Sequence, residues 1–209
     1  MAKFIVFEGL DGTGKTTQIR LLADYLKQKG EAVFTDVEPS GLPTGRFLRQ
    51  LLAGEFPSSP WATAALFLAD RINQNTDETN GIKKHLAAGD TVLLDRYYYS
   101  TFAYQGNETD LAWAMDIHFG CPEITKPDLT LFLTMAPEQC LARITANRAA
   151  DEMEIYETLD TLTAVSRQFD TVFSALKDRD NIIYINADGT VEEVHARIVN
   201  AVEAAFPED

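Results

Sequence analysis

Short apolar runs alternate along the chain with longer stretches in which apolar residues return every three or four positions. A short apolar run between turn residues is typical of a buried strand, and the longer spacing is typical of an amphipathic helix. We therefore expect strands at residues 3–8, 32–35, 91–94, 129–133 and 181–185. Helices are expected after the first strand up to Gly30, from Thr44, over residues 61–88, over residues 97–119 and from Thr190. The helix over residues 61–88 can be interrupted near residues 75–80.

The same spacing predicts which side chains face the core. In the first helix, Ile19, Leu22 and Leu26 share one face. The second predicted helix, which Thr44 can cap, carries Phe47, Leu48, Leu51 and Leu52. The residues Thr190–Glu193 read as a capping box, and the last helix is expected to turn Val191, Val194, Ile198 and Val202 inward.

The first strand leads directly into Gly9–Thr16, which reads G-x-x-x-x-G-K-T, the phosphate-binding loop (P-loop) of nucleoside triphosphate-binding proteins. Glycines allow backbone N–H groups to wrap a phosphate, and the N-terminus of the following helix adds a partial positive charge. Lys15 can then reach the β- and γ-phosphates, and the Thr16 hydroxyl can ligate Mg²⁺. This motif, in the required strand–loop–helix context, predicts a nucleoside triphosphate site.

Strands that alternate with helices predict a parallel sheet covered by helices on both faces, here the three-layer α/β fold of P-loop NTPases. The 209 residues contain no repeat or linker and suit a single domain, residues 1–209. In such a sheet the functional site lies at the carboxyl ends of the strands. Glu8 and Gly9 follow the first predicted strand, Glu38 the second, and Asp95 and Arg96 the third. We therefore expect one active site at this edge.

The net charge of −14 argues against non-specific nucleic-acid binding, which needs a basic surface. It also means that an anionic substrate must be bound by local cations. No apolar run reaches the length of roughly eighteen residues that a membrane helix needs, and no secretion leader is recognisable, so we expect a cytoplasmic protein without membrane contact. The two cysteines and three histidines are dispersed, and the sequence indicates no metal cluster beyond the Mg²⁺ implied by the loop.

Two further pairs are candidates for substrate contacts. Asp95 and Arg96 can serve as a neighbour of Mg²⁺ and a phosphate-binding fork, or they can form a structural ion pair. Phe67 and Arg71 stand four residues apart and share a helix face. Together they can offer a stacking ring and hydrogen-bond donors to a nucleobase, although Phe67 alone also suits a core position.

Residues 140–157 turn polar, with Arg143 and Arg148 among acidic residues. This pattern fits either a solvated helix face or a short lid, at about residues 142–157, that closes over phosphates and excludes water.

Taken together, these segments resemble the thymidylate kinase family over about residues 3–200. The matching pieces are Phe7–Thr17, Glu38–Pro39, Leu66–Arg71, Asp95–Tyr97, Ser100, Ala103–Gly106 and Lys126–Leu129. The stretch from Asp95 to Gly106 discriminates best, because the phosphate loop alone occurs with many activities.

The resemblance implies a nucleoside monophosphate kinase with a five-stranded parallel sheet, typically a homodimer, that transfers the γ-phosphoryl group of ATP to dTMP with Mg²⁺. It implies that Asp11 contacts the sugar 3′-hydroxyl, Arg96 holds the acceptor phosphate, and Tyr104 crowds the 2′ position. Phe67 would stack on thymine, with Arg71 and Gln105 as hydrogen-bonding partners. The remaining implied contacts are Glu38 and Ser100 on the acceptor, Thr16 and Asp95 on the metal, and Gly9, Asp11, Gly12, Thr13, Gly14, Lys15, Thr16, Thr17 and Arg143 on ATP.

Three positions depart from the family pattern. Val37 replaces the arginine that often precedes Glu38, Ile155 replaces a lid arginine, and Gly12 stands where some members carry arginine. A catalytic arginine should therefore come from the lid, with Arg148 as first choice and Arg143 as second. The alternatives are a deoxynucleoside kinase with Glu38 as base, a kinase for another nucleoside monophosphate, and a nucleotide-binding regulator without activity.

Overall fold

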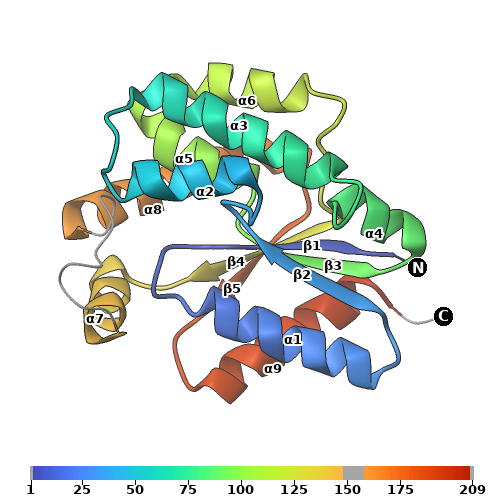
Figure 1. The fold of residues 1–209 in the computed structure, drawn as a ribbon. Coiled ribbons are helices and arrows are strands. Elements are labelled where there is room, and N and C mark those ends of the chain that lie inside the picture. The colour runs from blue at the N-terminus through green and yellow to red at the C-terminus, as the bar shows by residue number, and fades with distance from the viewer. Residues whose placement is uncertain (1, 148–157, 208–209) are drawn as a thin grey trace.

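The molecule is built on one sheet of five parallel strands, in the order β2-β3-β1-β4-β5 (Figure 1). This computed structural model describes residues 2–147 and 158–207. The strands are β1 (Phe4–Glu8), β2 (Val33–Val37), β3 (Thr91–Asp95), β4 (Leu129–Thr134) and β5 (Ile182–Asn186). The predicted five-stranded parallel sheet is confirmed, and each strand lies within a few residues of its predicted bounds.

The three central strands are buried on both faces, which is why they read as continuous apolar runs. The edge strands β2 and β5 are partly exposed. The register pairs Phe7 of β1 with Asp95 of β3 and with Leu131 of β4, so the carboxyl ends of these strands lie together. This alignment brings the polar residues after β1 and β3 to one edge of the sheet.

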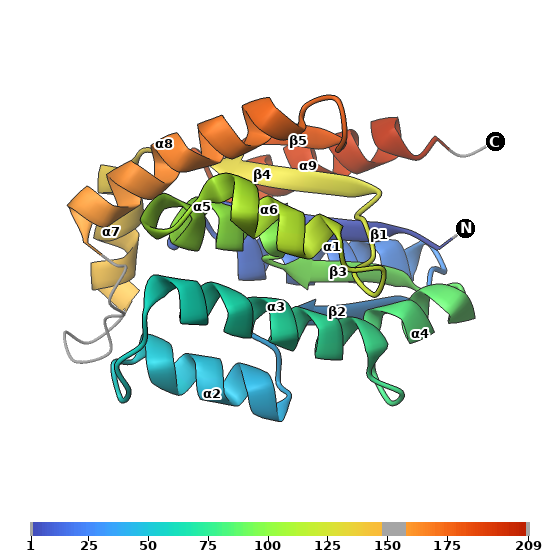
Figure 2. The ribbon, with the colours of Figure 1, turned by 90° about the horizontal axis from the view of Figure 1, so that it is seen from above.

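Helices cover both faces of the sheet (Figures 1 and 2). One layer contains α1 (Lys15–Gln28) and α9 (Val191–Ala205). The opposite layer contains α2 (Pro43–Leu52), α3 (Pro60–Thr76), α5 (Tyr98–Glu108), α6 (Leu111–Phe119) and α8 (Leu159–Leu176). Helices α4 (Ile82–Ala88) and α7 (Pro137–Asn147) lie at opposite ends of the molecule. No helix in the described ranges combines the length and the apolar character that crossing a lipid bilayer requires.

Helix α8 is not among the elements predicted above, although its pattern is regular. Its buried residues, Leu162, Val165, Phe169, Val172, Phe173 and Leu176, return every three or four positions. Thr158 caps its N-terminus by accepting a hydrogen bond from the Thr161 N–H, at 3.2 Å. Its aromatic rings pack against Tyr99 and Tyr104 of α5, so α8 supports the helix that follows β3.

Two predictions at helix starts were wrong. Thr44 does not cap α2, because this helix begins at Pro43 with Leu42 as its N-cap residue. Val191, which was expected to face inward, is the first residue of α9 and is 46% exposed, whereas Val194, Ile198 and Val202 are buried as predicted. In α2, Leu48, Leu51 and Leu52 are buried, and Phe47 is 42% exposed and stacks on Phe56 beyond the end of the helix.

Candidate active site

The phosphate loop forms one wall of a cavity of about 530 Å³ at the carboxyl edge of the sheet. Gly12 and Gly14 have φ of 84° and 92°, a left-handed backbone that side chains other than glycine rarely adopt. Gly14 is the N-cap residue of α1, and glycine offers no side-chain acceptor to the first N–H groups of the helix. The loop thus presents backbone donors and the positive end of the helix dipole to an anion.

Lys15 is buried and lies over the loop. Its Nζ donates to the carbonyl oxygens of Gly9, at 2.9 Å, and Leu10, at 3.0 Å, and lies 3.9 Å from the Asp11 carboxylate. Burial and the neighbouring Arg96 guanidinium lower the pKa of Lys15, while nearby carboxylates oppose this shift. An incoming phosphate offers the ammonium a stronger acceptor than the two carbonyls.

Thr16 and Asp95 supply oxygen atoms at the floor of the same cavity. The Thr16 hydroxyl donates to Asp95 Oδ2 at 2.8 Å, which joins the start of α1 to the end of β3. No group of three or more acidic, histidine or cysteine ligands exists among the described residues. A hydroxyl and a carboxylate beside a phosphate site suit Mg²⁺, which takes few protein ligands and completes its shell with phosphate oxygens and water.

A second cavity, of about 230 Å³, adjoins the first. Its lining includes Asp11, Val37, Glu38, Pro39, Arg49, Leu52, Phe67, Arg71, Arg96, Ser100, Thr101, Tyr104 and Gln105. Three of these residues, Asp11, Val37 and Arg96, also line the larger cavity. The two cavities therefore meet beside a guanidinium and a carboxylate, an arrangement that can bring two phosphate-bearing molecules together.

Arg96 stands at this junction with a strained backbone, φ 71°. Its backbone N–H donates to the Phe7 carbonyl, and its guanidinium donates to Asp11 at 2.6 Å and to Ser100 at 2.9 Å. Burial alone would lower the pKa of Arg96, but the surrounding carboxylates, Asp11 foremost, hold it above its usual range. Arg96 is therefore a permanent cation whose direction is set by neighbouring side chains.

The buried carboxylate of Glu8 anchors the start of α5 behind Arg96. Glu8 Oε1 accepts the backbone N–H groups of Tyr97, at 2.8 Å, and Ser100, at 3.1 Å, while Oε2 accepts the Ser100 hydroxyl at 2.7 Å. Burial raises the pKa of Glu8, and the Arg96 cation opposes that rise. Glu8 thus fixes Ser100, and Ser100 in turn orients Arg96.

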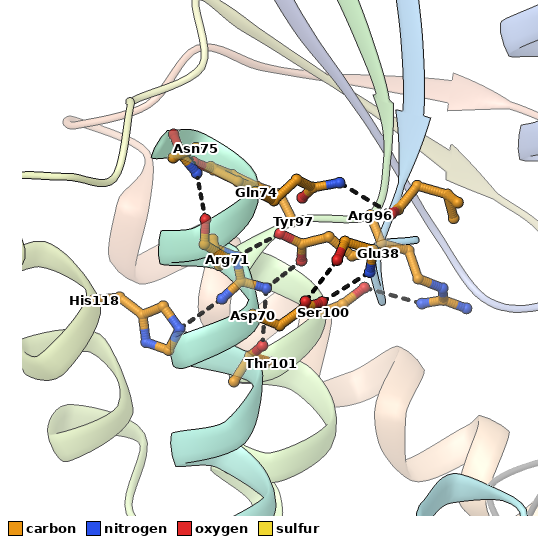
Figure 3. Close-up of polar contacts among 12 residues, drawn as sticks. Glu38, Asp70, Arg71, Gln74, Asn75, Arg96, Tyr97, Ser100, Thr101 and His118 are labelled. Atoms are coloured by element: carbon orange, nitrogen blue, oxygen red, sulfur yellow. Dashed lines mark hydrogen bonds and ion pairs between the residues drawn. The ribbon is translucent and has the colours of Figure 1, made fainter. Parts of the chain in front are cut away.

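Arg71 and Glu38 form a buried ion pair in the wall of the smaller cavity (Figure 3). Arg71 Nε donates to Glu38 Oε1 at 2.9 Å, and Nη2 donates to Oε2 and, at 3.2 Å, to the Thr101 hydroxyl. Burial raises the pKa of Glu38 to about 7, against the opposing effect of Arg71. Both Glu38 oxygens are occupied by the guanidinium fork, an arrangement suited to orienting Arg71.

The segment after β2 that carries Glu38 is held by Asp70 of α3. Asp70 accepts hydrogen bonds from the Ser40 N–H at 2.8 Å, the Ser40 hydroxyl at 2.6 Å and the Thr44 hydroxyl at 2.6 Å. Arg49 of α2 donates to the carbonyl oxygens of Ser40, at 2.7 Å, and Pro39. These contacts attach the segment after β2 to α2 and α3.

Comparison with known proteins identifies the family. The sequence profile of thymidylate kinases matches residues 7–198. The chain is 38% identical over 206 residues to a thymidylate kinase from Synechococcus sp. strain JA-2-3B'a(2-13), covering 98% of this chain and 96% of that protein. It is 36% identical over 208 residues to a thymidylate kinase from Desulfotalea psychrophila, covering 96% of this chain and 94% of that protein. It is 33% identical over 216 residues to a probable thymidylate kinase from Thermococcus kodakarensis, covering 99% of this chain and 100% of that protein. The chain belongs to the thymidylate kinase family.

Most site residues that the family resemblance implied lie in the two cavities. The larger cavity is lined by Asp11, Gly12, Thr13, Gly14, Lys15, Thr16, Thr17, Asp95, Arg96 and Arg143, and the smaller by Glu38, Phe67, Arg71, Ser100, Tyr104 and Gln105. Gly9 lines neither, and its carbonyl accepts from Lys15. Arg148 and Ile155 lie outside the described residues, as does most of the predicted lid.

The departure of this thymidylate kinase family member at Gly12 has a steric reason. A Cβ atom at Gly12 would lie 2.5 Å from the backbone carbonyl oxygen of Cys140 on α7. An arginine cannot occupy this position unless α7 moves. Arg143, one turn further along α7, lines the larger cavity and donates to the Gly12 carbonyl at 3.5 Å. Besides Lys15 of the loop, α7 therefore brings a second cation, Arg143, to the phosphate region.

Three residues around the site had no role in the sequence-based prediction: Arg49, Thr101 and His118. Glu8 was predicted to lie at the active-site edge, as the polar residue at the end of an apolar strand, but its contacts with Tyr97 and Ser100 were not. The three missed residues occupy ordinary helical positions, and their sequence neighbours do not distinguish them. Their contacts depend on how α2, α5 and α6 pack around Arg71 and the segment after β2.

Proposed function

We propose that this chain transfers the γ-phosphoryl group of ATP to the 5′-phosphate of dTMP, giving dTDP and ADP. The observation that carries the proposal is the pair of adjoining cavities, one lined by the phosphate loop and the other by polar and aromatic residues, with Asp11 and Arg96 lining both. Two nucleotides bound there would meet phosphate to phosphate. The family relationship supports dTMP as the acceptor.

On the donor side, the loop N–H groups and Lys15 bind the β- and γ-phosphates. Lys15 leaves the Gly9 and Leu10 carbonyls for the phosphate oxygens, because charged acceptors hold an ammonium more strongly. Thr16 and Asp95 would hold Mg²⁺ together with the phosphates. When bound there, the ion would supply positive charge to the transferring group.

On the acceptor side, Arg96 holds the dTMP phosphate at the junction of the cavities, and Asp11 reaches the sugar 3′-hydroxyl. Phe67 stacks on the base, Arg71 and Gln105 hydrogen-bond it, and Tyr104 excludes a 2′-hydroxyl. The attacking oxygen is already anionic, so no general base is required. Positioning and neutralisation of charge are what the protein must supply.

The occupied carboxylate of Glu38 favours a monophosphate acceptor over a nucleoside. A deoxynucleoside kinase needs a base for its hydroxyl acceptor, and Glu38 is the candidate for that role. Both Glu38 oxygens accept hydrogen bonds from Arg71 and the side chain is 3% exposed, so the carboxylate is not poised to take a substrate proton.

We also propose, from family membership, that residues 1–209 form a single kinase domain with a lid near residues 142–157. The protein would act as a homodimer in the cytoplasm. Arg148 is the first candidate for the cation that meets the transferring phosphoryl group, and Arg143 the second.

The deciding experiment is a panel of the four deoxynucleoside monophosphates and their nucleosides, assayed with Mg·ATP for ADP release. We expect turnover with dTMP and far less with every other acceptor. Lys15→Ala should remove turnover with all of them, because the β- and γ-phosphates lose their cation. Equal turnover of thymidine and dTMP would show that the assignment of dTMP as the acceptor is wrong. An active Lys15→Ala variant would contradict the assignment of kinase activity itself.

A further inference from the structure

His118 lies behind Arg71, on the side away from the Glu38 carboxylate (Figure 3). It belongs to α6, is 1% exposed and does not line the smaller cavity. Its Nε2 lies 2.6 Å from Arg71 Nη1, and its Nδ1 lies 2.7 Å from the Ala114 carbonyl oxygen. The edge-to-face contact with Phe102, with ring centroids 5.3 Å apart, holds the ring from a third side.

These two contacts determine where the ring proton sits. A carbonyl oxygen only accepts, so Nδ1 must carry hydrogen and donate it to Ala114. A guanidinium only donates, so Nε2 must be bare and accept from Arg71. Burial, with the Arg71 cation as a second cause, lowers the pKa of His118 to about 3. The neutral ring therefore persists throughout the physiological pH range.

The Arg71 guanidinium has five N–H donors, of which four have partners within the described chain. Nε–H donates to Glu38, the two Nη2 hydrogens to Glu38 and Thr101, and one Nη1 hydrogen to His118. The second Nη1 hydrogen has no partner among the described residues, and Arg71 lines the smaller cavity. The partners come from three segments, the loop after β2, α5 and α6, so the guanidinium plane is fixed.

We propose that His118 is a positioning residue for nucleobase selection: its Nε2 occupies one Nη1 hydrogen, so that Arg71 presents a single oriented N–H to the acceptor base. Such a donor can hydrogen-bond a base that has a carbonyl oxygen at the contacted position, as thymine has at C4. It cannot hydrogen-bond the amino group that cytosine has there, because that group is also a donor. This inference rests on the proposed function, because it requires a pyrimidine monophosphate in the smaller cavity.

The test uses two substitutions of similar size that separate the two ring nitrogens. In His118→Gln the amide reaches the position of Nε2 and can still accept from Arg71. In His118→Asn it reaches only the position of Nδ1, so the contact with Ala114 survives and the contact with Arg71 is lost. His195→Asn on α9 is the matched control, because His195 lines neither cavity.

Each variant is titrated with dTMP, dCMP and ATP by calorimetry and assayed for kcat and KM. Loss of a hydrogen bond to a charged group predicts that His118→Asn weakens dTMP binding roughly ten-fold or more, narrows the preference for dTMP over dCMP, and leaves ATP binding unchanged. His118→Gln and His195→Asn should behave like the wild type. Unchanged dTMP and dCMP affinities in His118→Asn would overturn the inference and leave the proposed function standing, and a parallel loss of ATP affinity would overturn it as a general structural effect.

Nitrogen NMR of the wild-type ring gives a second readout if the asparagine variant does not fold. We expect Nδ1 to be protonated and Nε2 to be bare, with a shift of the Nε2 signal on addition of dTMP and none on addition of ATP. A protonated Nε2 would overturn the inference. A wild type that binds no dTMP would overturn both this inference and the proposed function.

Discussion

At the scale of single residues, the site depends on side chains that orient other side chains. Arg96 is held by Asp11 and Ser100, and Ser100 is held by Glu8. Arg71 is held by Glu38 in the same manner. Fixing a guanidinium before substrate arrives removes much of the entropy cost of ordering it on binding.

Replacing Arg96 tests the junction of the two cavities. We expect Arg96→Ala to lose roughly 2–5 kcal/mol of transition-state stabilisation, the range for removing one partner of a desolvated charge pair. The measurement is kcat/KM for dTMP, with Arg46→Ala as control, since Arg46 is an exposed arginine of α2 that lines neither cavity. If Arg96→Ala lowers kcat/KM no more than Arg46→Ala does, Arg96 does not stabilise the transition state.

Glu38 gives the acceptor site a dependence on pH. Its pKa is raised to about 7, so acidification through that value protonates the carboxylate and weakens its hold on Arg71. We expect KM for dTMP to rise as the pH falls through about 7 in the wild type. Glu38→Gln should have a higher KM that lacks this step, because its amide does not titrate.

The phosphate of dTMP also titrates, with a pKa of about 6, so the ratio of wild-type to Glu38→Gln KM isolates the Glu38 contribution. The effect of pH on folding stability has the opposite sign to its effect on dTMP binding. A carboxyl group whose pKa is raised on folding binds its proton more tightly in the folded chain, so its contribution to the free energy of unfolding falls as the pH rises from about 4.5 to about 7. A KM ratio that stays constant across pH 7 would mean that Glu38 does not change charge there.

At the scale of helices and strands, prediction succeeded where the signal is local. Strand-ending polar residues, the glycine loop and the Thr190–Glu193 capping box each show within a few positions of sequence, and all three are present. The contacts of Arg71 could not be predicted in this way, because Glu38 and His118 lie 33 and 47 positions away from it. Which helical polar residue meets Arg71 depends on the packing of α3, α5 and α6.

The contact between the phosphate loop and α7 is an element-scale feature that one methyl group can test. Gly12 and Gly30 have similar left-handed φ values, 84° and 88°, but only Gly12 has a backbone atom in the path of a Cβ. We expect Gly30→Ala to cost about 1 kcal/mol of unfolding free energy from backbone strain, and Gly12→Ala distinctly more, because α7 must move. Chemical denaturation without nucleotide measures both, and equal costs would mean that α7 yields freely.

At the scale of the whole molecule, two polyanions must meet on a protein whose net charge is −14. The long-range field opposes them, so binding depends on a few cations close to the phosphates. Among the residues that the structure describes, Lys15, Arg96 and Arg143 are the basic ones that line the larger cavity. Lys15 lies against the phosphate loop and Arg96 lies at the acceptor junction, which leaves the transferring group itself in need of a further cation.

The two arginines proposed for that task can be separated by their kinetic effects. A contact that forms mainly in the transition state lowers kcat and leaves substrate affinity almost unchanged. We expect Arg148→Ala to lower kcat by a factor on the order of 10³, as loss of an arginine finger does, with little change in the affinity for ATP. Arg143→Ala should have a smaller effect on kcat and a larger one on ATP affinity, because Arg143 already lines the donor cavity next to the Gly12 carbonyl. Single-turnover measurements at saturating dTMP distinguish the chemical step from product release. If both substitutions change kcat equally and slightly, residues 142–157 serve only as a cover, and Lys15 and Mg²⁺ must neutralise the transferring phosphoryl group without an arginine.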